Sequence, residues 1–93
     1  MNKEFDKVIN AVANAMDIMP SQVLSHRRFQ ETIDARWIAV YLLRECGFYS
    51  SRISEKMAMS IRNVNIILSS IDNRLKNEKQ LRTILESARK YLL

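Results

Sequence analysis

Apolar residues recur every three or four positions along most of this chain, and this spacing places them on one face of an α-helix. The first such stretch predicts a helix over about residues 3–16, with apolar positions at Phe5, Val8, Ile9, Val12 and Met16. The next predicts a long helix from about Thr32 to Cys46, with apolar positions at Ile33, Trp37, Val40, Leu42 and Leu43. The long helix is apolar around much of its circumference, so we expect it to be the most buried element.

Turn and cap residues predict where the helices begin and end. Pro20 permits only a helix start or a turn, so Ser21–Leu24 is expected to form a single helical turn. Gly47 is expected to stop the long helix in a left-handed conformation. Either Ser50 or Ser51 is expected to cap the helix that follows.

The second half of the chain predicts three more helices in succession. The first is short and turns Ile53 and Met57 toward the core. The second, capped by Ser60, has an inward stripe made of Val64, Ile67, Leu68, Ile71 and Leu75. Asn77 and Gln80 resemble a capping pair at the start of the last helix. Its inward residues are Leu81, Ile84, Leu85, Ala88 and Leu92.

The composition agrees with this helical pattern. One Gly and one Pro are too few for the turns that several β-hairpins would need. A chain of 93 residues suits one domain and has little core to spare for a second. We therefore predict a single all-α domain over residues 1–93, a compact bundle of about six helices that contains a helix-turn-helix.

The positive charge is concentrated in the middle of the chain. The net charge is +5 and the sequence pI is about 9.7, which favours polyanionic partners. Residues 1–24 carry two basic and three acidic residues, a net of −1, whereas residues 25–76 carry nine basic and five acidic residues, a net of +4. The excess therefore lies with the predicted helix-turn-helix and the segment that precedes it.

Several other classes of function find no support in the residues. The single Cys46 cannot form an internal disulfide, which fits a reducing cytoplasm. No run approaches the roughly 18 apolar residues of a membrane span, and the first residues hold no apolar signal region. His26 has no metal ligands at a suitable spacing, and no Ser has nucleophile-elbow glycines. We expect a cytoplasmic protein that is no enzyme and that has no metal, cofactor, membrane partner or small-molecule substrate.

The run from Ile53 to Leu68 carries the clearest functional signal. Two helices joined by a few residues form a helix-turn-helix, whose second helix can enter the major groove of DNA. Arg62, Asn63 and Asn65 lie in the first turns of that helix, and Arg and Asn read base edges by paired hydrogen bonds. Such residues also occur on any solvated helix. Ile61 either touches a thymine methyl group or packs back on the turn.

Basic residues outside this helix suggest contacts with the DNA backbone and the minor groove. Arg27 and Arg28 lie in a loop, and a basic loop can insert into a narrow minor groove. The alternative is ordinary surface charge or a salt bridge to Glu31 or Asp34. Phosphate contacts are predicted for the residues at the start and on the surface of the helix before the turn. They are Ser51, Arg52 and Lys56.

From about Phe5 to Leu93 the order of elements resembles the C-terminal DNA-binding domain of the bacterial replication initiator DnaA. Residues 23–28, Val-Leu-Ser-His-Arg-Arg, look like that family's loop before its long helix. Residues 35–45, Ala-Arg-Trp-Ile-Ala-Val-Tyr-Leu-Leu-Arg-Glu, are similar to the helix itself. The helix-turn-helix over residues 53–64 has similar spacing apart from one apparent deletion in the turn. The family's Gly-Arg-Asp-His-Ser/Thr-Thr-Val signature is replaced by Met-Ser-Ile-Arg-Asn-Val at residues 59–64.

The resemblance implies roles for individual positions. Arg28 matches the loop arginine that enters the minor groove, and Arg36 matches an arginine that contacts the DNA backbone. Trp37 stands where the family has Gln. Ser50 and Ser51 fall near residues that lead the first helix of the motif onto phosphate. The family's base- and phosphate-contacting positions correspond to Ser60, Ile61, Arg62 and Asn63.

The resemblance and the basic charge together predict sequence-specific binding of double-stranded DNA, in replication initiation or transcription regulation. Because the signature turn differs, we expect little preference for the family's origin sequence. The alternative is a small helical module that binds another protein through the same two helices. The residues do not indicate an oligomeric state.

Overall fold

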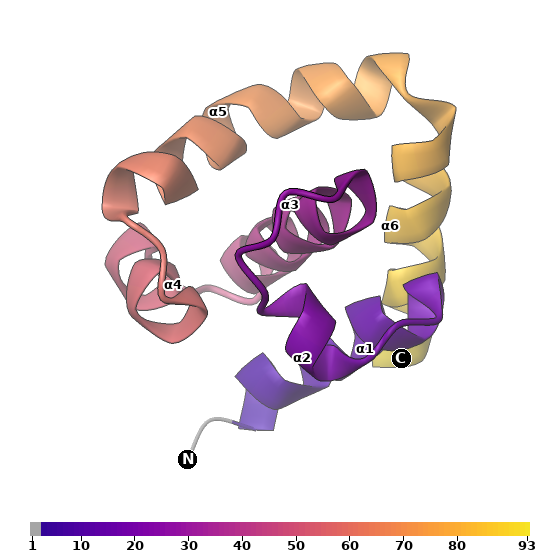
Figure 1. The fold of residues 1–93 in the computed structure, drawn as a ribbon, viewed down its shortest axis with the longest axis horizontal. Helices are drawn as coiled ribbons and strands as arrows, with labels where there is room; N and C mark the ends of the chain where they lie inside the picture. The colour runs from indigo at the N-terminus through magenta and orange to yellow at the C-terminus, as the bar shows by residue number, and fades with distance from the viewer. Residues whose placement is uncertain (1–2) are drawn as a thin grey trace.

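A computed structural model describes residues 3–93, which form six α-helices and no strands (Figure 1). The helices are α1 (Lys3–Met16), α2 (Pro20–Val23), α3 (Gln30–Glu45), α4 (Ser50–Met57), α5 (Ile61–Asn77) and α6 (Lys79–Leu92). The predicted all-α bundle of about six helices is therefore confirmed. None of the helices within residues 3–93 is long and apolar enough to cross a membrane.

α3 lies in the centre of the bundle, and the other helices surround it (Figure 1). Its inward positions are almost completely buried, as its apolar circumference predicted. They are Ala35, Ile38, Ala39, Val40, Leu42 and Leu43. α1 packs along α6 beneath α3, while α5 crosses the opposite side and packs on both α3 and α4. The order of packing brings the first turns of α3 close to the first half of α5.

Most helix ends lie where the sequence predicted them, with two exceptions. Gly47 has a φ of 97°, the left-handed conformation expected after α3. The prediction of a serine cap for α4 was wrong, because Tyr49 occupies the N-cap and makes no side-chain cap bond. The prediction of Asn77 as the cap of α6 was also wrong. α5 extends through Asn77, whose side chain donates to the Asn73 carbonyl, and Glu78 precedes α6.

A charged cluster joins α3, α5 and α6 around Arg74. The Arg74 guanidinium donates to both carboxylate oxygens of Glu78 at 2.7 Å and to Asp34 Oδ1 at 2.8 Å. Its Cζ also lies 4.7 Å from the centre of the Trp37 ring. Gln30 donates a further hydrogen bond of 2.8 Å to Asp34. Asp34 can therefore be buried in the first turns of α3, because its charge is paired and hydrogen-bonded.

Candidate nucleic-acid interface

α4 and α5 are joined by three residues whose backbone is held in a tight turn. Ala58 adopts the left-handed conformation with a φ of 53°, which reverses the chain after α4. The Met59 N–H donates to the Ser54 carbonyl at 3.0 Å, and the Ser54 hydroxyl donates to the Met59 carbonyl at 2.5 Å. The two bonds fix the direction in which the chain enters α5. The geometry is that of a helix-turn-helix.

Ser60 caps α5, as its position before the apolar stripe predicted. Its hydroxyl oxygen accepts a 3.1 Å hydrogen bond from the Asn63 backbone N–H. This bond satisfies one of the N–H groups that a helix start leaves without a partner. The side chains of the first turn are consequently held in a fixed orientation relative to the turn, with Arg62 and Asn63 exposed.

The three predicted base-reading residues face different directions around α5. All three are exposed, but Asn63 and Asn65 lie about 160° apart on a helix of 3.6 residues per turn. Arg62 lies between them, about 60° from Asn65. Asn63 faces the first turns of α3, and Arg62 faces away from the bundle. Ile61 is 48% exposed at the start of α5.

The loop over residues 25–29 is held in place by the start of α3. The Arg36 guanidinium donates to the Ser25 carbonyl at 2.5 Å and to the Arg27 carbonyl at 3.5 Å. The Thr32 hydroxyl contacts the Arg27 and Phe29 carbonyls at 2.8 and 3.0 Å. Arg36 was predicted to contact DNA backbone, and that stays a prediction. What the structure shows is that Arg36 holds this loop in place.

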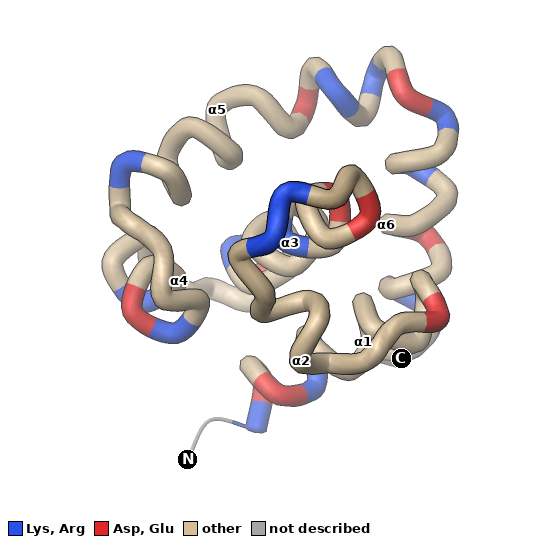
Figure 2. The backbone as a smooth tube through the Cα atoms, in the orientation of Figure 1, with Lys and Arg blue, Asp and Glu red and all other residues tan. Residues whose placement is uncertain are grey.

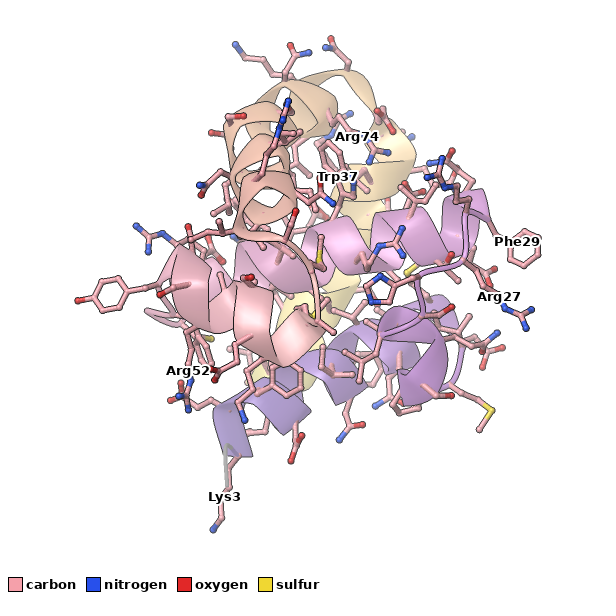
Figure 3. The ribbon with its side chains drawn as sticks, turned by 60° about the vertical axis from the view of Figure 1, so that its left-hand side comes forward. Lys3, Arg27, Phe29, Trp37, Arg52 and Arg74 are labelled. Atoms are coloured by element: carbon pink, nitrogen blue, oxygen red, sulfur yellow. The ribbon has the colours of Figure 1, made fainter. Side chains whose placement is uncertain are left out.

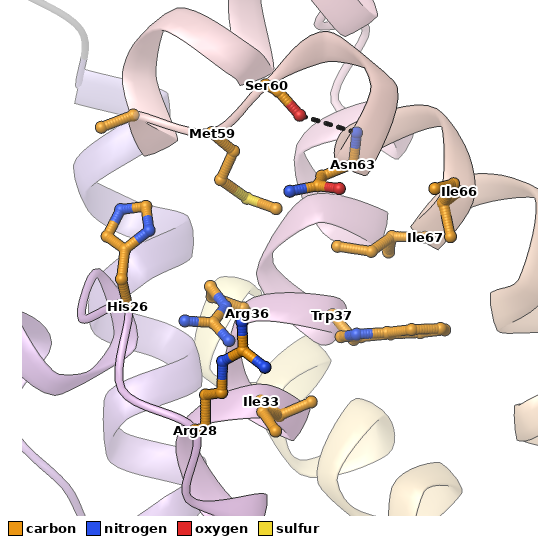
Figure 4. A pocket seen from close by; sticks show the side chains of 11 residues that line it. His26, Arg28, Ile33, Arg36, Trp37, Met59, Ser60, Asn63, Ile66 and Ile67 are labelled. Carbon is orange, nitrogen blue, oxygen red and sulfur yellow. Dashed lines mark hydrogen bonds between the residues drawn. The ribbon is translucent and has the colours of Figure 1, made fainter.

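The two loop arginines point in opposite directions. Arg27 extends into solvent at the edge of the molecule (Figure 3), whereas Arg28 turns back toward Arg36 (Figure 4). Neither side chain forms an ion pair within the part of the chain that the structure describes. Asp34, one of the two carboxylates considered as their partner, is bound to Arg74 instead. The charge of this loop is therefore free to meet an external anion.

Arg28 and Arg36 line a groove between the loop and α5 with a volume of about 450 Å³ (Figure 4). Ser60 and Asn63 lie on the opposite wall, so four of the predicted site residues converge here. The remaining lining consists of residues that the sequence did not single out for DNA contact. They are His26, Ile33, Trp37, Ala58, Met59, Ile66 and Ile67.

Electrostatic repulsion is evident where the two arginines meet. The pKa of Arg36 lies below its ordinary value, first because the guanidinium is partly buried and second because Arg28 is close by. No carboxylate lines the groove. In Figure 2 the two arginines of the loop, Arg27 and Arg28, form one blue stretch in front of α3, and the middle of α5 carries no charge. An anion entering the groove would relieve the repulsion between the arginines.

The predicted contacts on α4 lie elsewhere. Arg52 projects on the opposite side of the molecule from Arg27 (Figure 3) and forms a 3.9 Å ion pair with Glu55. The Lys56 ammonium lies 5.7 Å from the centre of the Phe5 ring and is half-buried. Of the two serines at the start of α4, Ser51 is exposed and Ser50 is half-buried. These four residues, Ser50, Ser51, Arg52 and Lys56, do not contribute to the groove.

No protein-family model matches the chain, and no curated protein matches its sequence. The likeness to the DnaA domain therefore depends on the sequence positions that carry it.

Sequence reasoning missed the apolar part of the groove for an identifiable reason. Ile66 is 47% exposed although the flanking Ile67 is buried. Ile66 lies outside the inward stripe that the sequence predicted for this helix, and it was not considered as a site residue. Ile33 was predicted to face inward and is only half-buried. The signal that could have revealed this part of the groove was Ile66, an apolar residue of α5 that lies outside the inward stripe.

Proposed function

We propose that this protein binds double-stranded DNA, with the start of α5 in the major groove and the loop over residues 25–29 on the flanking DNA. The observation that carries the proposal is the combination of a helix-turn-helix with a basic loop that has no carboxylate partner. Both features face the same side of the bundle, since they form the two walls of one groove. Unpaired cations beside an exposed helix start fit a phosphate backbone.

The orientation of the side chains assigns different tasks to the predicted residues. Arg62 faces away from the bundle and is best placed to reach a guanine edge. Asn65 lies on the same side of the helix, whereas Asn63 lies at the groove. Arg27 extends freely and is better placed than Arg28 to enter a minor groove. Arg52 and Ser51 would contact phosphates only where the DNA continues past α4.

The biological role follows the resemblance to the DnaA domain. We infer a role in replication initiation or in transcription regulation, in the bacterial cytoplasm. The turn at residues 59–64 departs from the family's signature. The preferred DNA sequence is therefore expected to differ from the family's origin box.

Selection of bound duplexes from a random pool tests binding and specificity together. An enriched sequence is expected, and its affinity should fall steeply as the salt concentration rises, since phosphate contacts release counterions. Failure to retain any duplex at low salt would exclude this proposal. It would favour the alternative, a helical module that binds another protein.

The Arg62→Ala variant separates base reading from general attraction. On the selected duplex we expect a loss of about 1–3 kcal/mol in binding free energy and relaxed specificity at one base pair. Binding to random duplex should change much less. The matched control is Lys76→Ala, which removes one charge from the last turn of the same helix. Equal losses on selected and random duplexes would show that Arg62 contacts only the backbone.

A further inference from the structure

The groove between the loop and α5 has the dimensions of a small-ligand site. Its volume of about 450 Å³ falls within the range of pockets that hold small molecules. Its walls come from α3 and the loop on one side, and from the turn and α5 on the other (Figure 4). Major-groove binding by Arg62 uses the outer face of α5. It leaves this space unexplained.

One part of the groove is cationic and lacks an anion. In residues 3–93 three arginines, Arg52, Arg74 and Arg89, have a carboxylate within 4.0 Å, and the other six arginines, the two of the groove among them, do not. Arg28 has none, and the bonds of Arg36 go to neutral carbonyl groups. Each guanidinium presents a planar fork of donors that matches the oxygens of a phosphate group, and both arginines line the same groove.

The rest of the groove is largely apolar, and its polar side chains are those of His26, Ser60 and Asn63. Ile33 and Trp37 of α3 face Ile66 and Ile67 of α5, with Met59 between the two helices (Figure 4). A phosphate group alone gains no binding free energy from an apolar surface, whereas a sugar with a planar base gains it by burying its own apolar surface there. The Asn63 side chain makes no hydrogen bond within the described chain and can pair with a polar edge of a base.

We propose that this groove binds a single nucleotide unit. Its phosphate lies between Arg28 and Arg36, and its base lies against the apolar side chains near Asn63. The nucleotide is either free or part of an unpaired strand, because a base stacked within a duplex cannot enter the groove. Its binding excludes simultaneous contact of Arg28 and Asn63 with duplex DNA. Only this competition depends on the function proposed above.

Trp37 lines the groove and is the only tryptophan of the chain, so its fluorescence reports on occupancy. The wild-type protein is titrated at low salt with thymidine 5′-monophosphate, inorganic phosphate and thymidine. We expect the monophosphate to bind at least about tenfold more tightly than either fragment, because only it uses both parts of the groove. Short unpaired oligonucleotides with and without a 5′-phosphate then distinguish a free nucleotide from a strand.

Arg28→Gln and Arg27→Gln form a matched pair in the same loop. Arg28→Gln should weaken binding of the monophosphate about tenfold. Arg27→Gln should weaken it less than about twofold, since Arg27 points into solvent. Ile66→Ser changes the opposite wall without altering charge. It should bring the affinity of the monophosphate down toward that of inorganic phosphate. Circular dichroism of each variant verifies the fold.

The outcomes separate this proposal from duplex binding. No saturable change of Trp37 fluorescence, equal losses in the two arginine variants, or equal affinity for monophosphate and inorganic phosphate would each overturn the nucleotide site. Duplex retention is measured on the same proteins. Wild-type protein that retains duplex but binds no monophosphate contradicts this proposal alone, and wild-type protein that binds the monophosphate but retains no duplex contradicts only the proposed function.

Discussion

Two sets of arginines next to α3 differ in how their charge is compensated. Arg74 lies over one side of Trp37 and binds two carboxylates, Asp34 and Glu78. Arg28 and Arg36 meet in the groove that Trp37 also lines, and they bind no carboxylate in the described chain. Both sets connect α3 with its neighbours. Only the second leaves positive charge available to a ligand.

The difference shows how to separate structural cations from binding cations in a basic protein. The hydrogen bonds that Arg74 donates to Glu78, followed by the one that it donates to Asp34, raise the pKa of Arg74 above its ordinary value despite burial. The pKa of Arg36 shifts the other way, because burial and a neighbouring cation both disfavour its charge. A net charge of +5 contains both kinds of arginine. Only their surroundings distinguish them.

Arg74→Met is expected to produce the largest change in stability. It leaves Asp34 buried without a cation and should lower the free energy of unfolding by about 2 kcal/mol, less than for a fully buried pair. Urea unfolding followed by circular dichroism measures the change. Lys76→Met, on the exposed side of the same helix, is the control and should change little. Equal effects would mean that the Arg74 cluster is no more than surface charge.

Substitutions at Ser60 separate stability from binding. Ser60→Ala removes the cap of α5 and should cost about 1 kcal/mol of stability. Ser60→Asp restores a capping oxygen and should recover most of that loss. It also places a carboxylate in the groove, so it should weaken binding of the monophosphate at Arg28 and Arg36. Retained binding in Ser60→Asp would place the phosphate elsewhere.

Arg28→Glu converts the groove arginines into a compensated pair like that of Arg74. The new carboxylate can pair with Arg36, which should change stability by about 0–1 kcal/mol in the favourable direction. Nucleotide affinity should be lost at the same time. Thermal unfolding and Trp37 fluorescence measure the two quantities on one sample. A variant that is less stable than wild type would show that Arg28 holds the loop in place.

The smallest expected effect is a pH dependence at Glu78. The hydrogen bond from Arg74 lowers the pKa of this carboxyl in the folded protein. A lowered folded pKa contributes stability above the unfolded pKa, and this contribution disappears as the pH falls through the folded value. Glu78→Gln should therefore flatten the acid side of a plot of melting temperature against pH. An unchanged plot would show that the pKa of Glu78 is the same in the unfolded chain as in the folded protein.

The sequence by itself determined the helices, because their apolar periodicity, proline, glycine and cap residues act over a few positions. It therefore predicted α1, α3, the Gly47 stop and the Ser60 cap. The sequence did not predict the boundary between α5 and α6 correctly, because Asn77 and Glu78 are both polar and compete for the position that precedes α6. It also marked the basic loop and the start of α5 as candidate DNA-contacting segments.

Only the tertiary structure decided which charges remain unpaired. Asp34 and Arg74 are 40 positions apart, so no local pattern reveals that Asp34 is already bound and cannot neutralise Arg28. The packing of α5 on α3 also places Ile66 and Asn63 in the lining of the same groove as Arg36. Coulomb attraction depends on distance in space, whereas a sequence pattern records distance along the chain. The helical bundle could therefore be predicted from the sequence, whereas the binding groove could be recognised only in the tertiary structure.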